Sequence, residues 1–370
     1  MKHNKESLPE SVESALAIAY RSTGLGLYGA IMRFAGMPLE KIALYMNSAQ
    51  VSGKNQLRQA MYLTFQNEKT GARSFLKPYK VVGAASGVAW FLQYSVMGMV
   101  FQVCDTALSS ALGVPVVPYG EALMEDPSKG EQSESTSAVH SAKVASKILL
   151  APVLAGTIES VVANRAEVQR YFGISKFAKM ESSLRWNPLS RLFGPAFVAN
   201  STRNCIMSAT SFVITPILYR NHFPQELKSQ SSMFWFGLSV NVFLGNTIAI
   251  TQQALWGRAL DYAIAPGATA ARNIHYSTVA KESLAKEGFA AFYTVPKWGS
   301  RVLMNAPVQG TLPWFYNEVL PLWEGDFLSA ANLVYGKMIS HDSQEIRAAD
   351  NSMNLYSVES KATATSPRQE

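Results

Sequence analysis

The sequence predicts an all-α membrane protein, and three observations lead to that class. Only 16% of the 370 residues are charged, against roughly 25% in a typical soluble domain. Hydrophobic residues make up 48% of the chain and mean hydropathy is +0.03, which fits apolar helices that also carry polar faces. Several stretches are almost free of charge over the ~20 residues that a bilayer crossing requires.

The strongest candidate spans are Val81–Cys104 and Ser229–Gly257, which contain no charge and many Gly, Ala, Ser and Thr residues. Such small residues let membrane helices approach closely. Four weaker candidates bring the number to six, and charges within them are expected to face a bundle interior or a cavity. The alternative is six buried helices of a soluble α protein. The weaker candidates are Ala15–Leu44 (with Arg21 and Arg33), Ile148–Asn164 (with Glu159), Phe193–Tyr219 (with Arg203) and Val302–Val319.

The charges between the spans alternate in sign. Lys41–Lys80 holds seven basic residues and one acid, and Asn164–Arg191 holds six basic residues and two acids. Phe101–His140, between them, holds six acids and one Lys. Because basic loops remain on the side from which a membrane protein inserts, an even number of spans places both termini on the acidic side.

The chain also repeats itself at a period of about 100 residues, as repeat architectures do. Short related segments begin at Met37 (MPLEKIALY), Gly156 (GTIESVVAN) and Ile250 (ITQQALWGR). Each is followed by a basic loop and a second span. The loops are predicted to contain short amphipathic helices at Lys54–Gln66, Ser175–Leu184 and Tyr276–Lys286.

The predicted organisation therefore has three repeats with additions between and around them. The C-terminal extension contains a further candidate amphipathic helix, Asp326–Ile339, before a tail predicted to be disordered. The segments are a polar N-terminal segment (1–14), repeat one (15–115), a flexible acidic loop (116–142), repeat two (143–228), repeat three (229–321) and the extension with its tail (322–370).

This pattern resembles the mitochondrial carrier family, whose repeats carry P-x-[DE]-x-x-[KR] and then [DE]-G-x-x-x-x-aromatic-[KR]-G. Repeat three (KEGFAAFYTVPKWGSRVLMNAPVQGTLPWFYNE) and the segment GAIMRFAGMPLEKI carry the resemblance best. It covers about Ala15 to Pro321. The resemblance implies six transmembrane helices in a pseudo-threefold barrel around a central cavity, with short amphipathic helices in the matrix. It also implies the mitochondrial inner membrane, with both termini on the intermembrane-space side.

The gate that the resemblance implies is degenerate in this chain. In the family, the acid of each first motif pairs with a cation three positions later, but those positions hold Ala43, Val162 and Trp256 here. The opposite gate keeps its aromatic residues and lacks every acid. Glu40 is predicted to have one fixed partner, either Lys41 or an Arg from another repeat. The remnants of the matrix gate are Pro38, Glu40, Glu159 and Gln253.

Four arginines are candidate contacts in the cavity: Arg203 first, with Arg301, Arg33 and Arg21 in support. The functional interpretation is an anion-binding cavity. The alternative is that Arg203 is paired within a fixed bundle. The segment GLGLYG (Gly24–Gly29) is interpreted as close helix packing and not as a phosphate loop.

No catalytic triad or metal-ligand spacing stands out in the sequence, because its five His are scattered in predicted loops and tails. We therefore expect a protein that is not an enzyme and has no cofactor, with bound cardiolipin or a similar anionic lipid as a candidate ligand. Nucleic acid is not an expected partner. The first hypothesis is a non-transporting accessory subunit or scaffold in an inner-membrane assembly, a respiratory-chain complex among the candidates. The alternative is a carrier that exchanges a small anionic metabolite.

Overall fold

The computed structural model describes residues 8–46, 51, 55–67, 70–82, 84–114, 134–172, 193, 196–264 and 276–339. Within these ranges almost every residue is helical, and the only strand-like pairing is a single bridge between Gln66 and Arg73. The all-α prediction is confirmed for this part of the chain. Contact clustering divides the protein into two compact units, Ile18–Leu320 and a smaller one made of Met1–Ala17 with Pro321–Glu370.

The first third of the larger unit contains α1 (Glu10–Ala35, whose first turns belong to the smaller unit), α2 (Met37–Met46), α3 (Gln56–Phe65), α4 (Lys77–Val82) and α5 (Ala84–Leu112). Helix α1 ends before Gly36, and Pro38 falls in the first turn of α2. A proline there removes an N–H that has no partner within the helix, so the ~3 kcal/mol cost of a mid-helix proline does not arise. The predicted bend is therefore a break between two helices. The predicted amphipathic helix Lys54–Gln66 forms as α3.

The middle third contains α6 (Glu134–Phe172), α9 (Phe197–Ser208), the π-helical segment η2 (Ala209–Ile214) and α10 (Thr215–His222). Helix α6 begins inside the range predicted as a flexible loop (116–142) and continues past Asn164 into the predicted basic loop. Glu167 therefore lies on a helix. The candidate helix Ser175–Leu184 lies outside the described residues.

The last third contains α11 (Gln230–Val240), η4 (Asn241–Gly245), α12 (Asn246–Ile264), α13 (Tyr276–Glu287), α14 (Val295–Asn305), η7 (Ala306–Gly310), α15 (Leu312–Trp314) and η8 (Phe315–Val319). Helix α11 begins with a capping box in which Ser229 and Ser232 each accept the other's backbone N–H. Helix α13 forms where the third amphipathic helix is predicted. Wider π-turns interrupt the helices at η4, η7 and η8.

The smaller unit contains the beginning of α1 and a helix that continues to residue 339. The backbone N–H of Leu8 donates to Oδ1 of Asn332 at 2.9 Å. The candidate amphipathic helix Asp326–Ile339 is thus helical, and the tail beyond it lies outside the described residues.

Three helices of the described residues are long and apolar enough to cross a membrane: Ser86–Leu112, Val139–Gln169 and Ser231–Leu260. They overlap the predicted spans Val81–Cys104, Ile148–Asn164 and Ser229–Gly257. The described residues of the other three predicted ranges are also mostly helical, with the break at Gly36 in the first, η2 in the second and η7 and η8 in the third.

Helix α6 has the inverse of the side-chain distribution of a soluble amphipathic helix. Its buried face carries small and polar residues such as Ala151, Ala155 and Ser160. Its exposed face carries large aliphatic side chains, among them Leu149 at 68% and Val153 at 48% exposure. An apolar outer face with polar groups paired inside is the arrangement that hydrocarbon favours.

The interior between α5 and α6 contains a buried ion pair that the sequence analysis did not identify. Lys147 Nζ lies 3.2 Å from Asp105 Oδ2, and both side chains are nearly inaccessible to solvent. The sequence places Asp105 among the six acids of the predicted acidic stretch Phe101–His140. It belongs to α5, which continues to Leu112, and its charge is paired inside the bundle with Lys147.

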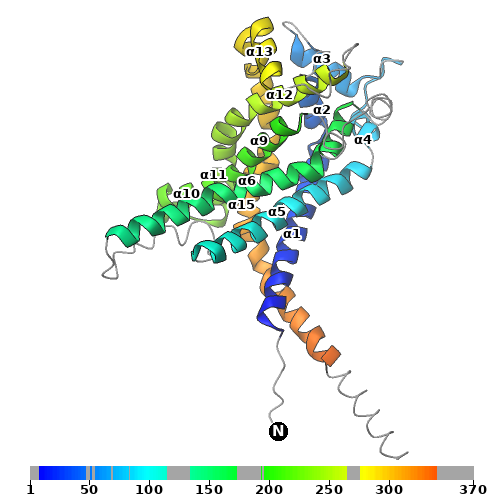
Figure 1. Cartoon of the computed structure of the whole chain (residues 1–370). Helices are drawn as coiled ribbons and strands as arrows, with labels where there is room; N and C mark the ends of the chain where they lie inside the picture. The colour runs from blue at the N-terminus through cyan, green and yellow to red at the C-terminus, as the bar shows by residue number, and fades with distance from the viewer. Residues whose placement is uncertain are drawn as a thin grey trace, which may run out of the picture. The chain divides into compact units, whose positions relative to one another are not determined.

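Small residues determine how closely the helices pack. Helix α6 lies between α5 and α9 (Figure 1). A Cβ added to Gly156 would lie 2.4 Å from the backbone N of Cys205, so α6 and α9 touch through their backbones. In the GLGLYG segment, a Cβ on Gly29 would lie 2.2 Å from the ring of Tyr94. The interpretation of GLGLYG as close packing is confirmed.

Gly156→Ala should destabilise the protein, because the added methyl group overlaps backbone that can move only if α9 moves. Overpacking of this kind costs about 1–3 kcal/mol. The matched control is Gly87→Ala in α5, where no atom lies within 4 Å of the added Cβ. The control should gain about 0.5–1 kcal/mol from helix propensity. Thermal unfolding of both variants in detergent measures the difference, and equal midpoints would contradict this packing.

Candidate functional site

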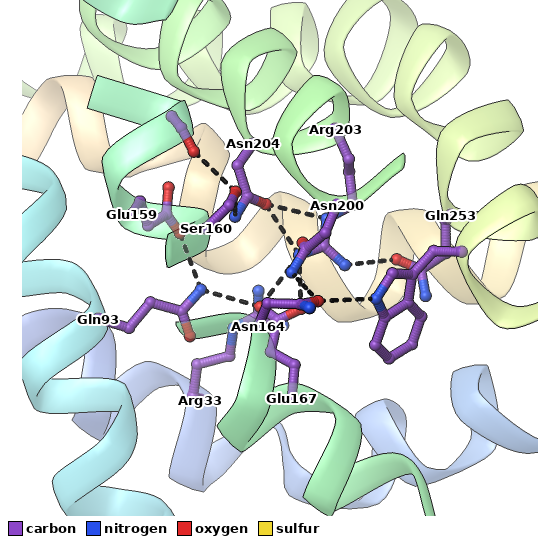
Figure 2. A network of polar contacts seen from close by, with 12 residues as sticks. Arg33, Gln93, Glu159, Ser160, Asn164, Glu167, Asn200, Arg203, Asn204 and Gln253 are labelled. Carbon is purple, nitrogen blue, oxygen red and sulfur yellow. Dashed lines mark hydrogen bonds and ion pairs between the residues drawn. The ribbon is translucent and has the colours of Figure 1, made fainter. Parts of the chain in front are cut away.

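The larger unit has a polar interior where side chains from α5, α6, α9 and α12 meet (Figure 2). These side chains surround a cavity that also receives residues from α1, α2, α14 and η7. The lining is a mixture of three cations, three acids and neutral amides. The charged members are Arg33, Glu40, Glu159, Glu167, Arg203 and Arg301.

Arg203, on α9, is the centre of the network and is only 6% exposed. Its Nη2 lies 2.7 Å and 3.0 Å from the two carboxylate oxygens of Glu167 on α6. Its Nη1 donates to Oε1 of Gln253 on α12 at 2.8 Å. Asn200 and Asn204 accept further hydrogen bonds from the same guanidinium. One side chain thus joins three helices, using the planar set of donors that only arginine offers.

Asparagine side chains connect the same helices without net charge. Asn200 Nδ2 donates to Asn164 Oδ1 at 2.7 Å, and Trp256 Nε1 donates to the same oxygen at 3.2 Å. Asn204 Nδ2 donates to Ser160 Oγ at 3.0 Å. All of these side chains are at most 4% exposed. Their polar atoms therefore depend on one another for the hydrogen bonds that water would otherwise supply.

Glu159 is held differently from Glu167. It is 3% exposed, and its hydrogen bond comes from Gln93 Nε2 of α5, at 2.8 Å. The same amide nitrogen lies 3.1 Å from Glu167 Oε1. One neutral amide therefore bridges two carboxylates. Of these two, Glu167 has the direct ion pair with Arg203.

Arg33 and Glu40 approach the cavity from α1 and α2. Arg33 Nε donates to Tyr94 Oη at 2.9 Å, and Gln309 Nε2 lies 3.5 Å from the same oxygen. The Arg33 guanidinium also interacts electrostatically with the Glu40 carboxylate. Arg33 belongs to the same predicted repeat as Glu40, and the fixed partner predicted for Glu40, Lys41 or an Arg from another repeat, stays a prediction.

Arg301 completes the lining from α14. It is 3% exposed, and it makes no hydrogen bond or ion pair to any residue that the structure describes. The cavity that it faces has a volume of about 50 Å³. A buried water occupies ~10–15 Å³ on this measure, so only a few waters or one small ion fit there.

Six of the eight residues predicted from sequence line this one cavity: Glu40, Glu159, Gln253, Arg203, Arg301 and Arg33. Pro38, in the first turn of α2, is not among the lining residues. Arg21 lies elsewhere on α1, with its guanidinium 5.7 Å from the ring centre of Tyr316.

The three positions where the resemblance expects gate cations have different environments. Ala43 is buried, Val162 is 47% exposed on the outer face of α6, and Trp256 is buried against Asn164. The cation that is present nearby, Arg258, forms an ion pair with Glu287 of α13 at 2.5 Å. Hydrogen bonds from Arg258 hold the pKa of Glu287 below its ordinary value.

Sequence analysis missed Glu167 and most of the amides, namely Gln93, Asn164, Asn200, Asn204, Asn305 and Gln309. Helical spacing could have identified some of them. Ser160 and Asn164, and likewise Asn200 and Asn204, are four residues apart and so share one helix face.

Among the described residues, no group of three or more His, Cys, Asp or Glu could hold a metal ion. Comparison with protein-family models, with curated proteins and with solved structures finds no match to this chain.

Arg203→Met should be strongly destabilising, since it leaves Glu167 buried without its ion-pair partner. Breaking a buried pair on one side costs about 3–5 kcal/mol. The double variant Arg203→Met/Glu167→Gln removes both charges and should recover much of that loss. Chemical or thermal unfolding in detergent measures all three proteins.

The matched control for this prediction is Arg258→Met, which breaks an ion pair with a half-exposed partner. That pair should contribute no more than about 1 kcal/mol. If Arg203→Met and Arg258→Met lose the same stability, Arg203 does not hold the interior together.

Proposed function

We propose that this protein is a membrane-embedded, carrier-like helical protein that serves as a non-transporting accessory subunit or scaffold in a membrane assembly. The observation that carries the proposal is the closed polar interior around Arg203. A transported metabolite needs a cavity of about 300–1,000 Å³, whereas the cavity here has about 50 Å³.

The contacts of the interior favour a static role. A gate opens when a few ion pairs break, and they must form again on closing. Opening this interior would separate Arg203 from Glu167 and Gln253 together, and would also break the Asn164–Asn200 and Ser160–Asn204 bonds. Buried polar groups left without partners cost about 1–3 kcal/mol each. A scaffold needs packing and satisfied polar groups, and does not need this separation.

The proposal includes a location in the mitochondrial inner membrane, with the basic loops on the matrix side. Its support is the resemblance of the three repeats to the carrier family, together with the alternation of loop charge and the apolar outer face of α6. Other subunits of the assembly and anionic lipid are the proposed partners.

Exchange of a small anionic metabolite is the second candidate function. The observation that favours it is the convergence of six charged side chains from five helices on one cavity. In this case the structure would represent a closed conformation, and the Arg203 contacts would be the closed gate.

Purification in mild detergent separates the two functions. We expect the protein to migrate within a large membrane complex, and the protein reconstituted alone into vesicles to exchange none of a panel of small anions. A monomer that exchanges an anion, with exchange lost in Arg203→Ala and retained in the control Arg220→Ala, would contradict the scaffold proposal and support the carrier.

A further inference from the structure

Arg301 is a buried cation whose partner is not supplied by the described protein. A guanidinium carries five N–H donors, and this one is 3% exposed without a hydrogen bond or ion pair to any residue in the described ranges. Leaving a charged group in this state is far more costly than leaving a neutral one. Arg301 lines the cavity, so an occupant of the cavity can supply the partner that the guanidinium lacks among the described residues.

Among the described residues no acid forms a direct ion pair with Arg301, although Glu167 attracts it electrostatically from a greater distance. Glu167 accepts the ion pair from Arg203, and Arg33 interacts with Glu40. Arg203 and Arg33 both lie close enough to repel Arg301 electrostatically. Three positive side chains thus surround a small polar space, and one of them has no counter-charge in direct contact.

The volume of the space decides the class of the occupant. About 50 Å³ is too small for a carboxylic acid metabolite or a nucleotide. It admits a monatomic anion together with a water or two. The tryptophan, methionine and amide side chains that complete the lining can surround a halide without a second full charge.

An anion that enters the site changes the charge balance of the cavity. The lining has three basic and three acidic side chains, so a lone anion would leave one uncompensated negative charge in a region of low dielectric. Glu159 can remove this charge by taking up a proton, since its only hydrogen bond to a described residue is from the neutral Gln93 amide. The titratable and charged groups around Glu159 are Glu167, Arg203, Arg33, Glu40, Arg301, Cys205 and Tyr94.

We propose that this cavity is a binding site for one small monovalent inorganic anion of the halide class, held by Arg301 and accompanied by one proton on Glu159. The anion and the proton both come from the solvent, and no covalent bond changes. The pair is electrically neutral, so its binding leaves the net charge of the interior unchanged. A resident anion of this size would stabilise a closed interior, and is compatible with a protein that transports nothing.

Equilibrium dialysis of the purified full-length protein with radiolabelled chloride tests this site. The wild-type protein should bind one chloride. Uptake of one proton with the anion makes the apparent affinity fall about tenfold for each unit of rising pH, over the pH range in which Glu159 is ionised in the anion-free protein. Absence of chloride binding from mildly acidic to mildly alkaline pH would overturn the proposal and indicate that the cavity contains only water.

Two variants separate the roles of the two residues. Arg301→Met should lose chloride binding, because it removes the cation that holds the anion. Glu159→Gln imitates the protonated carboxyl group and should bind chloride with an affinity independent of pH. The control Arg220→Met, on α10 and outside the cavity lining, should bind as the wild type does.

Retention of chloride binding in Arg301→Met would overturn the assignment of the anion to Arg301. The same pH dependence in Glu159→Gln as in the wild type would overturn the assignment of the proton. Both results are independent of the test of the proposed function, since chloride binding is measured on the purified protein and not on its complex or its transport.

Discussion

The structure depends on one buried guanidinium. Arg203 contacts Glu167 on α6 and Gln253 on α12, and its own helix supplies Asn200 and Asn204. In an apolar environment no water is available to hydrogen-bond to these groups. The three helices must therefore keep the spacing at which the groups hydrogen-bond to one another. Gly156 makes that spacing attainable, because it lets the backbones of α6 and α9 touch beside the network. Packing and polar contacts therefore specify the same arrangement of the same helices.

The distribution of side chains follows from this constraint. The bundle buries its amides and charges and exposes Leu149, Val153 and Val162 from α6. The polar groups that the described interior buries include the Arg203 network and the Asp105–Lys147 pair. In water such a surface would aggregate, whereas in lipid it is the surface expected of a helix bundle. The apolar exterior and the polar interior are thus two consequences of one environment.

Sequence predicted the helices better than their ends. Long apolar windows located α5, α6 and the α11–α12 stretch, but both α5 and α6 extend well beyond the windows. Asp105 and Glu167 lie in those extensions, where the sequence places them among the loop charges. Counting charges along the chain gives no information on whether a charge has a buried partner, and each of these two has one.

In the site, charged residues within apolar segments were easy to single out, and Arg203 and Glu159 are examples. Asn164 and Asn200 were missed because only charged residues were singled out within the apolar segments, and a neutral amide adds no charge. That Glu167 is the partner of Arg203 follows from the packing of α6 against α9. The spacing of these two residues along the chain does not predict their pairing.

Two positions of the degenerate gate, 253 and 256, form hydrogen bonds inside this bundle. Where the carrier pattern expects a cation at position 256, an indole donates to Asn164, and at position 253 an amide replaces the acid and accepts from Arg203. Neither position carries an ion pair here: the bond of Trp256 is neutral, and in the bond of Gln253 only Arg203 is charged. Such bonds lack the long-range attraction that draws two separated charges back into contact. This absence of paired charges at both positions is part of the reason why we propose a scaffold and not a gate. Among the described residues that line the cavity, Arg301 is the cation without a direct partner, and there we propose that an ion from outside the protein acts.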